Sequence, residues 1–108
     1  MRIATTDHIA GVRTVTAVGL VVGIAVRSRG LGGNIMAGLD ALGNGSALAE
    51  YRDGLAAVRR DAVAQMIAEA ESLGANAVVG VRFDTAEVGH EMVEIIAYGT
   101  AVVIAQDP

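Results

Sequence analysis

The sequence predicts an α+β fold in which antiparallel strands flank one long amphipathic helix, and three observations predict it. Segments rich in β-branched residues lie near both ends of the chain, at 14–27 and 92–104. Between them, apolar residues recur every three or four positions over residues 48–73, which is the period of an α-helix. The length of 108 residues allows a single domain, residues 1–108.

The N-terminal part of the chain predicts two strands. Ile3–Thr6 is a short candidate, and a polar bend that begins at Asp7 follows it. Residues 14–27 are apolar at nearly every position, which predicts a long strand covered on both faces. Gly19 and Gly23 within this strand indicate a bulge, a bend or the close approach of another backbone, unless they are merely tolerated small residues.

The middle of the chain predicts one short and one long helix. Glycine-rich residues 30–34 form a loop before a helix of about two turns at 35–42. A long helix over Leu48–Leu73 follows, with Ser46 as its N-cap and Gly74 as its C-terminal glycine. At 1.5 Å per residue it is about 39 Å long, so it lies along a full side of the sheet or extends onto a neighbouring subunit. Its predicted buried face consists of Leu48, Tyr51, Leu55, Val58, Ala62, Met66, Ala70 and Leu73.

The C-terminal third predicts a hairpin of two strands, 77–83 and 92–104, with the reversal inside 84–91. Strand alternation gives one face of the first strand to Ala77, Val79, Val81 and Phe83. In the second strand, one face belongs to Val93, Ile95, Ala97, Gly99, Ala101 and Val103. Apolar residues occupy both faces of the long strands, which is more than one helix can cover. The sequence therefore predicts a homo-oligomer.

Composition excludes several classes of function. The chain contains no cysteine, and all eight of its basic residues are arginine, so thiolate metal sites, cysteine nucleophiles and lysine Schiff bases are ruled out. A net charge of −4 with 3% aromatic residues argues against nucleic acid as a partner. The longest uncharged run, Thr14–Val26, is shorter than the ~20 residues of a membrane-spanning helix. The N-terminus has no apolar segment of signal-peptide length. We therefore expect a cytoplasmic protein without a membrane partner.

Acidic residues and one histidine gather around the predicted hairpin. Asp84, Glu87 and His90 are the candidate metal ligands, and Glu91 and Glu94 lie close to them in the sequence. Imidazole and carboxylate groups suit a borderline or hard divalent ion, which is the cofactor this pattern allows. In a cyclic homo-oligomer the hairpin repeats around the axis, so one ligand from each subunit would suffice. The alternative is an ordinary solvated turn.

Other polar features have simpler interpretations. Asp7 and His8 fit a turn in which the carboxylate bonds nearby backbone amides, although a ligand role for the imidazole stays open. The loop at 30–34 is either an anion-binding helix start or a hinge. No serine stands in a nucleophile elbow, and Glu91 and Glu94 as an acid/base pair lack aromatic side chains to bind a substrate. An enzyme is the least favoured class of function.

The segment 73–85, LGANAVVGVRFDT, together with 98–102, YGTAV, resembles the YbjQ-like family of small bacterial proteins. Thr5-Thr6-Asp7, the glycine-rich loop into Asn34-Ile35 and the helix that ends near Glu69-Ala70-Glu71 stand in the order of that family. The resemblance implies an α+β subunit of a pentameric ring, in a family described in terms of heavy-metal binding whose biochemical role is largely unassigned. It fixes no metal ligand. Some relatives carry a cysteine where this chain has the aliphatic stretch 17–20.

These observations lead to two functional hypotheses. The first is a non-enzymatic, cytoplasmic homo-oligomer, a homopentamer by the resemblance, that acts as a small binding module for a metal ion or another small ligand. The alternative is a structural or scaffolding ring that presents its surface to a partner protein.

Overall fold

One helix and four strands make up the part of the chain that the computed structural model describes, which is residues 1–28, 45–88 and 92–107. The elements are β1 (Arg2–Ile3), β2 (Val12–Ser28), α2 (Gly45–Ser72), β3 (Ala77–Val88) and β4 (Met92–Gln106). The strands form one mixed sheet in the order β1-β3-β4-β2, in which β1 pairs with β3 in parallel and the other neighbours are antiparallel. The predicted α+β class is confirmed. The helix expected at 35–42 and the glycine-rich loop before it lie outside the described residues.

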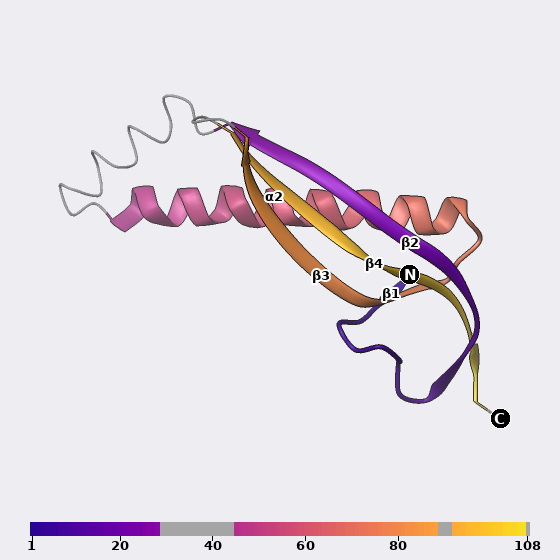
Figure 1. Cartoon of the computed structure of the whole chain (residues 1–108). Helices are drawn as coiled ribbons and strands as arrows, with labels where there is room; N and C mark the ends of the chain where they lie inside the picture. The colour runs from indigo at the N-terminus through magenta and orange to yellow at the C-terminus, as the bar shows by residue number, and fades with distance from the viewer. Residues whose placement is uncertain (29–44, 89–91, 108) are drawn as a thin grey trace.

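The molecule is long and narrow, with extents of 59 × 25 × 17 Å. Its radius of gyration is 17.5 Å, against about 13 Å for a compact domain of this length. Figure 1 shows the cause, because the N-terminal part of α2 runs past the end of the strands. Near that end, a Cβ atom on Gly54 would lie 1.4 Å from Nη1 of Arg27, one residue before the end of β2. The turns of α2 before Gly54 therefore project beyond the sheet.

The core lies between α2 and one face of the sheet, which we call the inner face. Ala62, Met66 and Ala70 are fully buried there, and Leu55 and Val58 pack against them. The strands contribute Val21, Ala25, Val78, Val81, Val93, Ile95, Ala97 and Ala101. The buried face predicted for the helix is confirmed over this stretch. Leu73 is the exception, since the helix has ended and half of its side chain is exposed.

Two glycines shape β2, and the sequence indicated both. Gly19 has a φ of 149° and stands where the register against β4 shifts, so it marks a β-bulge. Gly23 faces α2, where a Cβ atom would lie 1.9 Å from the carbonyl oxygen of Ala62. Only a residue without a side chain lets the helix backbone come this close. The first glycine thus bends the strand, and the second allows close packing.

β3 carries a bulge that the sequence analysis missed. Its register against β4 shifts between Val79 and Arg82, and Gly80 there has a φ of 62°. The extra residue reverses the alternation, so Val78 and Val81 both face α2, while Val79 faces the other side of the sheet. The prediction that Ala77, Val79, Val81 and Phe83 share one face is therefore wrong. The corresponding prediction for β4 is confirmed, since Val93, Ile95, Ala97 and Ala101 all lie in the core under α2.

The strand bounds also differ from those predicted. β1 ends at Ile3 rather than at Thr6, because the bulge in β3 interrupts regular pairing, although Ala4 and Thr6 still exchange backbone hydrogen bonds with β3. β3 continues to Val88 instead of ending at Phe83. Its last residues pair with the start of β4, from Asp84 opposite Ile96 to Val88 opposite Met92. The predicted reversal around Gly89 and His90 lies outside the described residues.

The helix ends in a glycine motif, as predicted. Gly74 has a φ of 84°, and its N–H donates to the carbonyl oxygen of Glu71 at 3.0 Å. The N–H of Ala75 donates to the carbonyl oxygen of Ala70 at 3.1 Å, which completes a Schellman motif. The side chain of Asn76 then pairs with the backbone of Ile104, accepting from its N–H at 2.7 Å and donating to its carbonyl oxygen at 3.0 Å. This short connection fixes the start of β3 against β4.

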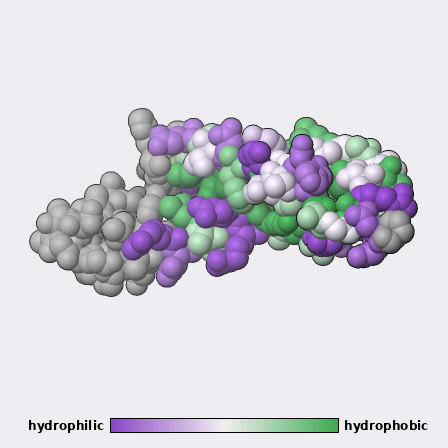
Figure 2. Space-filling model, turned by 90° about the horizontal axis from the view of Figure 1, so that it is seen from below, coloured by the Kyte–Doolittle hydropathy of each residue, from purple (hydrophilic) through white to green (hydrophobic). Residues whose placement is uncertain are grey.

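Within residues 1–28, 45–88 and 92–107, the outer face of the sheet, opposite α2, is covered at one end only. There Ile9 packs with Ala77, Val79, Val102 and Ile104. Further along, six neighbouring apolar side chains form what we call the outer-face patch: Leu20, Val22, Ile24 and Val26 of β2, and Ile96 and Tyr98 of β4. Leu20 is 69% exposed. The described chain leaves this stretch of the outer face largely exposed, so coverage of both faces of β2 stays a prediction that depends on a neighbouring subunit. Hydrophobic surface is visible along the molecule (Figure 2).

Candidate functional site

The structure separates the predicted metal ligands. Asp84 and Glu87 lie in the regular part of β3, opposite Ile96 and Val93 of β4. Three residues apart in an uninterrupted strand, their side chains lie on opposite faces of the sheet. Asp84 shares the outer face with Glu94, while Glu87 lies on the inner face. The third candidate, His90, lies outside the described residues.

Asp84 already has one hydrogen-bond partner, because its Oδ1 accepts from the backbone N–H of Thr85 at 2.9 Å. Within the described ranges, no group of three histidine, aspartate or glutamate side chains is placed to hold a metal ion. The metal site at Asp84, Glu87 and His90 therefore stays a prediction. In one protomer, the two described ligands cannot reach the same ion.

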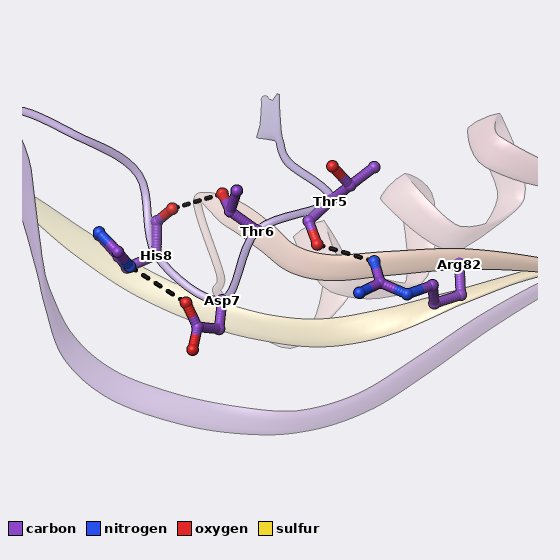
Figure 3. Close-up of polar contacts among 5 residues, drawn as sticks. All are labelled: Thr5, Thr6, Asp7, His8 and Arg82. Carbon is purple, nitrogen blue, oxygen red and sulfur yellow. Dashed lines mark hydrogen bonds and ion pairs between the residues drawn. The ribbon is translucent and has the colours of Figure 1, made fainter.

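A second polar cluster lies in the N-terminal loop where it crosses the bulge of β3 (Figure 3). Arg82 donates from Nη1 to the carbonyl oxygen of Thr5 at 2.7 Å and to that of Val81 at 2.8 Å. The N–H of Gly80 donates to the carbonyl oxygen of Thr6 at 2.7 Å. The bulge and the loop thus satisfy each other's backbone groups, which explains why the loop lies here.

Asp7 and His8 lie at the exposed tip of this loop. Nδ1 of His8 is 3.1 Å from Oδ1 of Asp7, and the side chains are 77% and 96% exposed. The hydrogen bond with His8, its charge, and the backbone N–H of Asp7 itself hold the pKa of Asp7 below its ordinary value of 3.8. The turn itself is closed by Thr6, whose hydroxyl donates to the carbonyl oxygen of His8 at 2.5 Å.

This arrangement orients an imidazole through a carboxylate and leaves its Nε2 facing solvent. Metal-binding histidines are held in this way, with the second ring nitrogen bonded to a carboxylate. Asp7 and His8 were candidates from the sequence, whereas Arg82, which anchors their loop, was not. A lone arginine among the apolar residues of 77–83 was the signal that could have found it.

Gln65 and Glu69 of α2 make contacts that the sequence did not indicate. Oε2 of Glu69 accepts from the backbone N–H of Val22 at 3.1 Å. Oε1 of Gln65 accepts from the N–H of Ile24 at 3.4 Å. Both reach the free edge of β2, which is the last strand of the sheet.

Comparisons with known proteins identify the family of this chain and support its fold. A family model described as "Putative heavy-metal-binding" matches residues 1–105. A UPF0145 protein of Bradyrhizobium sp. (strain ORS 278) is 47% identical over 104 residues, which is 96% of this chain and 93% of the relative. UPF0145 proteins of Thermoplasma acidophilum and Saccharolobus solfataricus are 48% and 53% identical, covering 92% and 87% of this chain and 82% of each relative. The last two organisms are archaea, so the expectation of a purely bacterial family is wrong.

Among solved structures, a Pediococcus pentosaceus protein of unknown function assigned to the DUF74 family superimposes with a TM-score of 0.64. The match covers 97% of this chain and 98% of that one at 17% sequence identity, so it supports the fold alone. No helix in the described part of the chain is both long enough and apolar enough to cross a membrane. The family match over nearly the whole chain and the near-half identity to full-length relatives agree, and this chain belongs to the YbjQ-like family of UPF0145 proteins.

Proposed function

We propose that this chain is the subunit of a cytoplasmic homo-oligomer, a homopentamer, that acts as a non-enzymatic binding module for a divalent metal ion or another small ligand. The observation that carries the proposal is the open outer-face patch. Leu20, Ile24, Val26 and Tyr98 are 69%, 44%, 49% and 37% exposed on one continuous stripe. Soluble monomers rarely leave such a stripe in water.

Because α2 is the single helix of the described chain, a second copy would be needed to cover the outer-face patch. α2 covers the inner face, and the N-terminal loop covers one end of the outer face, so the described chain has no further element to place over the patch. A neighbouring subunit that packs on the patch would remove these side chains from water, at about 25 cal/mol for each Å² of apolar surface. The number five rests on the resemblance to the family.

Assembly would also change which side chains can lie close enough together to bind one metal ion. Asp84 lies on the outer face, opposite Ile96 of the outer-face patch. Packing through the patch therefore brings carboxylates of neighbouring copies towards each other, and a ring needs one ligand from each copy rather than three from one. This is how Asp84 would serve although a single protomer keeps it apart from Glu87, which lies on the inner face.

The oligomer is tested by light scattering coupled to gel filtration. We expect the wild type to have a mass of about five times the 11.0 kDa of the chain. Leu20→Asp should lower the mass to that of smaller species, because it buries a charge in the interface. The matched control is Ile3→Gln, which changes an exposed apolar residue of β1, at the other edge of the sheet, and should keep the wild-type mass. A monomeric wild type would contradict the proposal.

The ligand is tested by calorimetric titration with zinc, nickel, copper and manganese. We expect saturable binding of at least one ion, weakened in Asp84→Asn, Glu87→Gln or His90→Ala. Glu71→Gln, on the exposed surface of α2, is the control that should bind as the wild type does. If none of the four ions gives heat, the metal part is wrong. A specific protein partner recovered by the intact oligomer would then favour the scaffolding role.

A further inference from the structure

The free edge of β2 is occupied by side chains of the protein's own helix. β2 is the outermost strand, and an outermost strand presents unpaired N–H and C=O groups to which another strand can add. Here the N–H of Val22 donates to Glu69 and that of Ile24 to Gln65, at 3.1 Å and 3.4 Å. Two successive edge N–H groups are thus satisfied without a neighbouring strand.

The match depends on the spacing of the two elements. Residues four apart on a helix are separated by about 6.0 Å along its axis, and residues two apart on a strand by about 6.8 Å. Gln65 and Glu69 therefore present acceptors at nearly the interval of the N–H groups. Nε2 of Gln65 donates to Oδ2 of Asp61 at 3.5 Å, which directs its amide oxygen to the strand. We call Gln65 and Glu69 the edge ladder.

Gly23 brings the ladder within reach. It lies between Val22 and Ile24, on the inner face, where the carbonyl oxygen of Ala62 would be 1.9 Å from a Cβ atom. The helix backbone therefore lies close against the strand, so the side chains of Gln65 and Glu69 can reach its edge. Gly23 therefore allows both the close packing of α2 on β2 and the coverage of the edge of β2.

If the edge ladder were removed, the edge of β2 would suit one particular partner. Residues 14–26 are uncharged, rich in β-branched side chains and free of proline, which is the composition of segments that pair with copies of themselves.

We propose that the edge of β2 is a strand-pairing surface for the same edge of a second copy of this chain, and that the edge ladder of Gln65 and Glu69 holds it closed. The carboxylate oxygen of Glu69 and the amide oxygen of Gln65 take the place of the carbonyl groups of a neighbouring strand. This surface is separate from the packing of subunits through the outer-face patch, which uses side chains of the sheet face and leaves the edge untouched.

The direct test is hydrogen exchange at individual backbone amides. In Glu69→Ala the amide of Val22 should exchange about fivefold faster, and in Gln65→Ala that of Ile24, because each loses a hydrogen-bond acceptor. Glu71→Ala removes the same charge from the same helix and should leave both amides unchanged. Glu69→Gln keeps an acceptor and should preserve slow exchange at Val22. Unchanged exchange in both alanine variants would overturn the proposal.

The consequence for assembly is tested with the double variant Gln65→Ala/Glu69→Ala. Light scattering over a range of protein concentrations should show species larger than the wild type that grow with concentration, with increased thioflavin T fluorescence. Glu71→Ala should keep the wild-type mass. Fast exchange without larger species would refute self-pairing. If the double variant does not fold, the same light-scattering measurement on Glu69→Ala alone tests whether the opened edge pairs with a second copy.

This outcome is independent of the proposed oligomer. A monomeric wild type contradicts packing through the outer-face patch, yet opening of the ladder would still produce species larger than that monomer. Conversely, a pentameric wild type whose mass is unaffected by loss of the ladder supports the oligomer and overturns the closed edge.

Discussion

At the scale of single residues, the pairing of Asp7 with His8 predicts a measurable titration. The hydrogen bond and charge of His8 lower the pKa of Asp7. We therefore expect His8→Ala to raise the pKa of Asp7 towards 3.8, as followed by the carboxyl carbon in NMR. A lowered pKa stabilises the fold above the ordinary pKa, and this contribution disappears as the pH falls through the lowered value. Because both side chains are exposed, the change in stability should be small.

The same pair needs a control that keeps the loop intact. His8→Asn retains a polar side chain but cannot become charged, so the pKa of Asp7 should rise in this variant as well. Arg82→Lys, in contrast, acts on the anchor of the loop and not on the pair. An unchanged pKa of Asp7 in both His8 variants would show that the hydrogen bond at 3.1 Å does not persist in solution.

At the scale of elements, the packing of α2 on β2 predicts opposite effects for the same substitution at two glycines. Gly23→Ala places a Cβ atom 1.9 Å from the carbonyl oxygen of Ala62 and 2.6 Å from the backbone nitrogen of Met66. Backbone atoms cannot swing aside, so the helix must withdraw. We expect a loss of about 2–3 kcal/mol in the free energy of unfolding, measured by urea denaturation.

Gly54→Ala is the matched control. Its Cβ atom would meet the guanidinium of Arg27, which is the end of a flexible side chain that can move away. Alanine also favours the helix over glycine by about 1 kcal/mol. This variant should be as stable as the wild type or more so, and equal destabilisation at both positions would refute close backbone packing at Gly23.

The helices and strands also show how much of the fold could be predicted from the sequence. Periodicity located the long helix and the two C-terminal strands, because burial on one side leaves a clear pattern. It failed at Gly80, since one extra residue reverses every later face without changing the composition. The same limit applied to the metal candidates, because Asp84 and Glu87 looked like turn residues as long as the strand was expected to end at Phe83.

The contacts between the helix and the strand edge could not be predicted from the sequence. Glu69 and Gln65 are ordinary polar residues of an exposed helix face, and nothing in their spacing shows that a strand edge lies beside them. Their role depends on the position of β2 at the edge of the sheet and on the close approach at Gly23. The sequence indicated the special role of the glycine but not what it brings together.

At the scale of the whole molecule, a composition of 53% apolar residues becomes a definite surface. The sequence predicted a surplus of apolar side chains over what one helix covers. The structure locates part of that surplus on the outer face of β2 and β4, because α2 covers the inner face and partly runs past the sheet. A surplus can be counted from composition, whereas its position depends on the strand order.

That strand order also has a consequence for how the chain is made. β4 lies between β3 and β2, yet it is the last of the three to be synthesised. Until it emerges from the ribosome, β3 can pair only with the short β1 and β2 has no strand beside it, so residues 12–28 must wait for residues 92–106. Pairing between segments so distant in the chain is slow to form. Folding is therefore completed only after translation of β4, and during that interval β2 is the segment that most needs protection from other nascent chains.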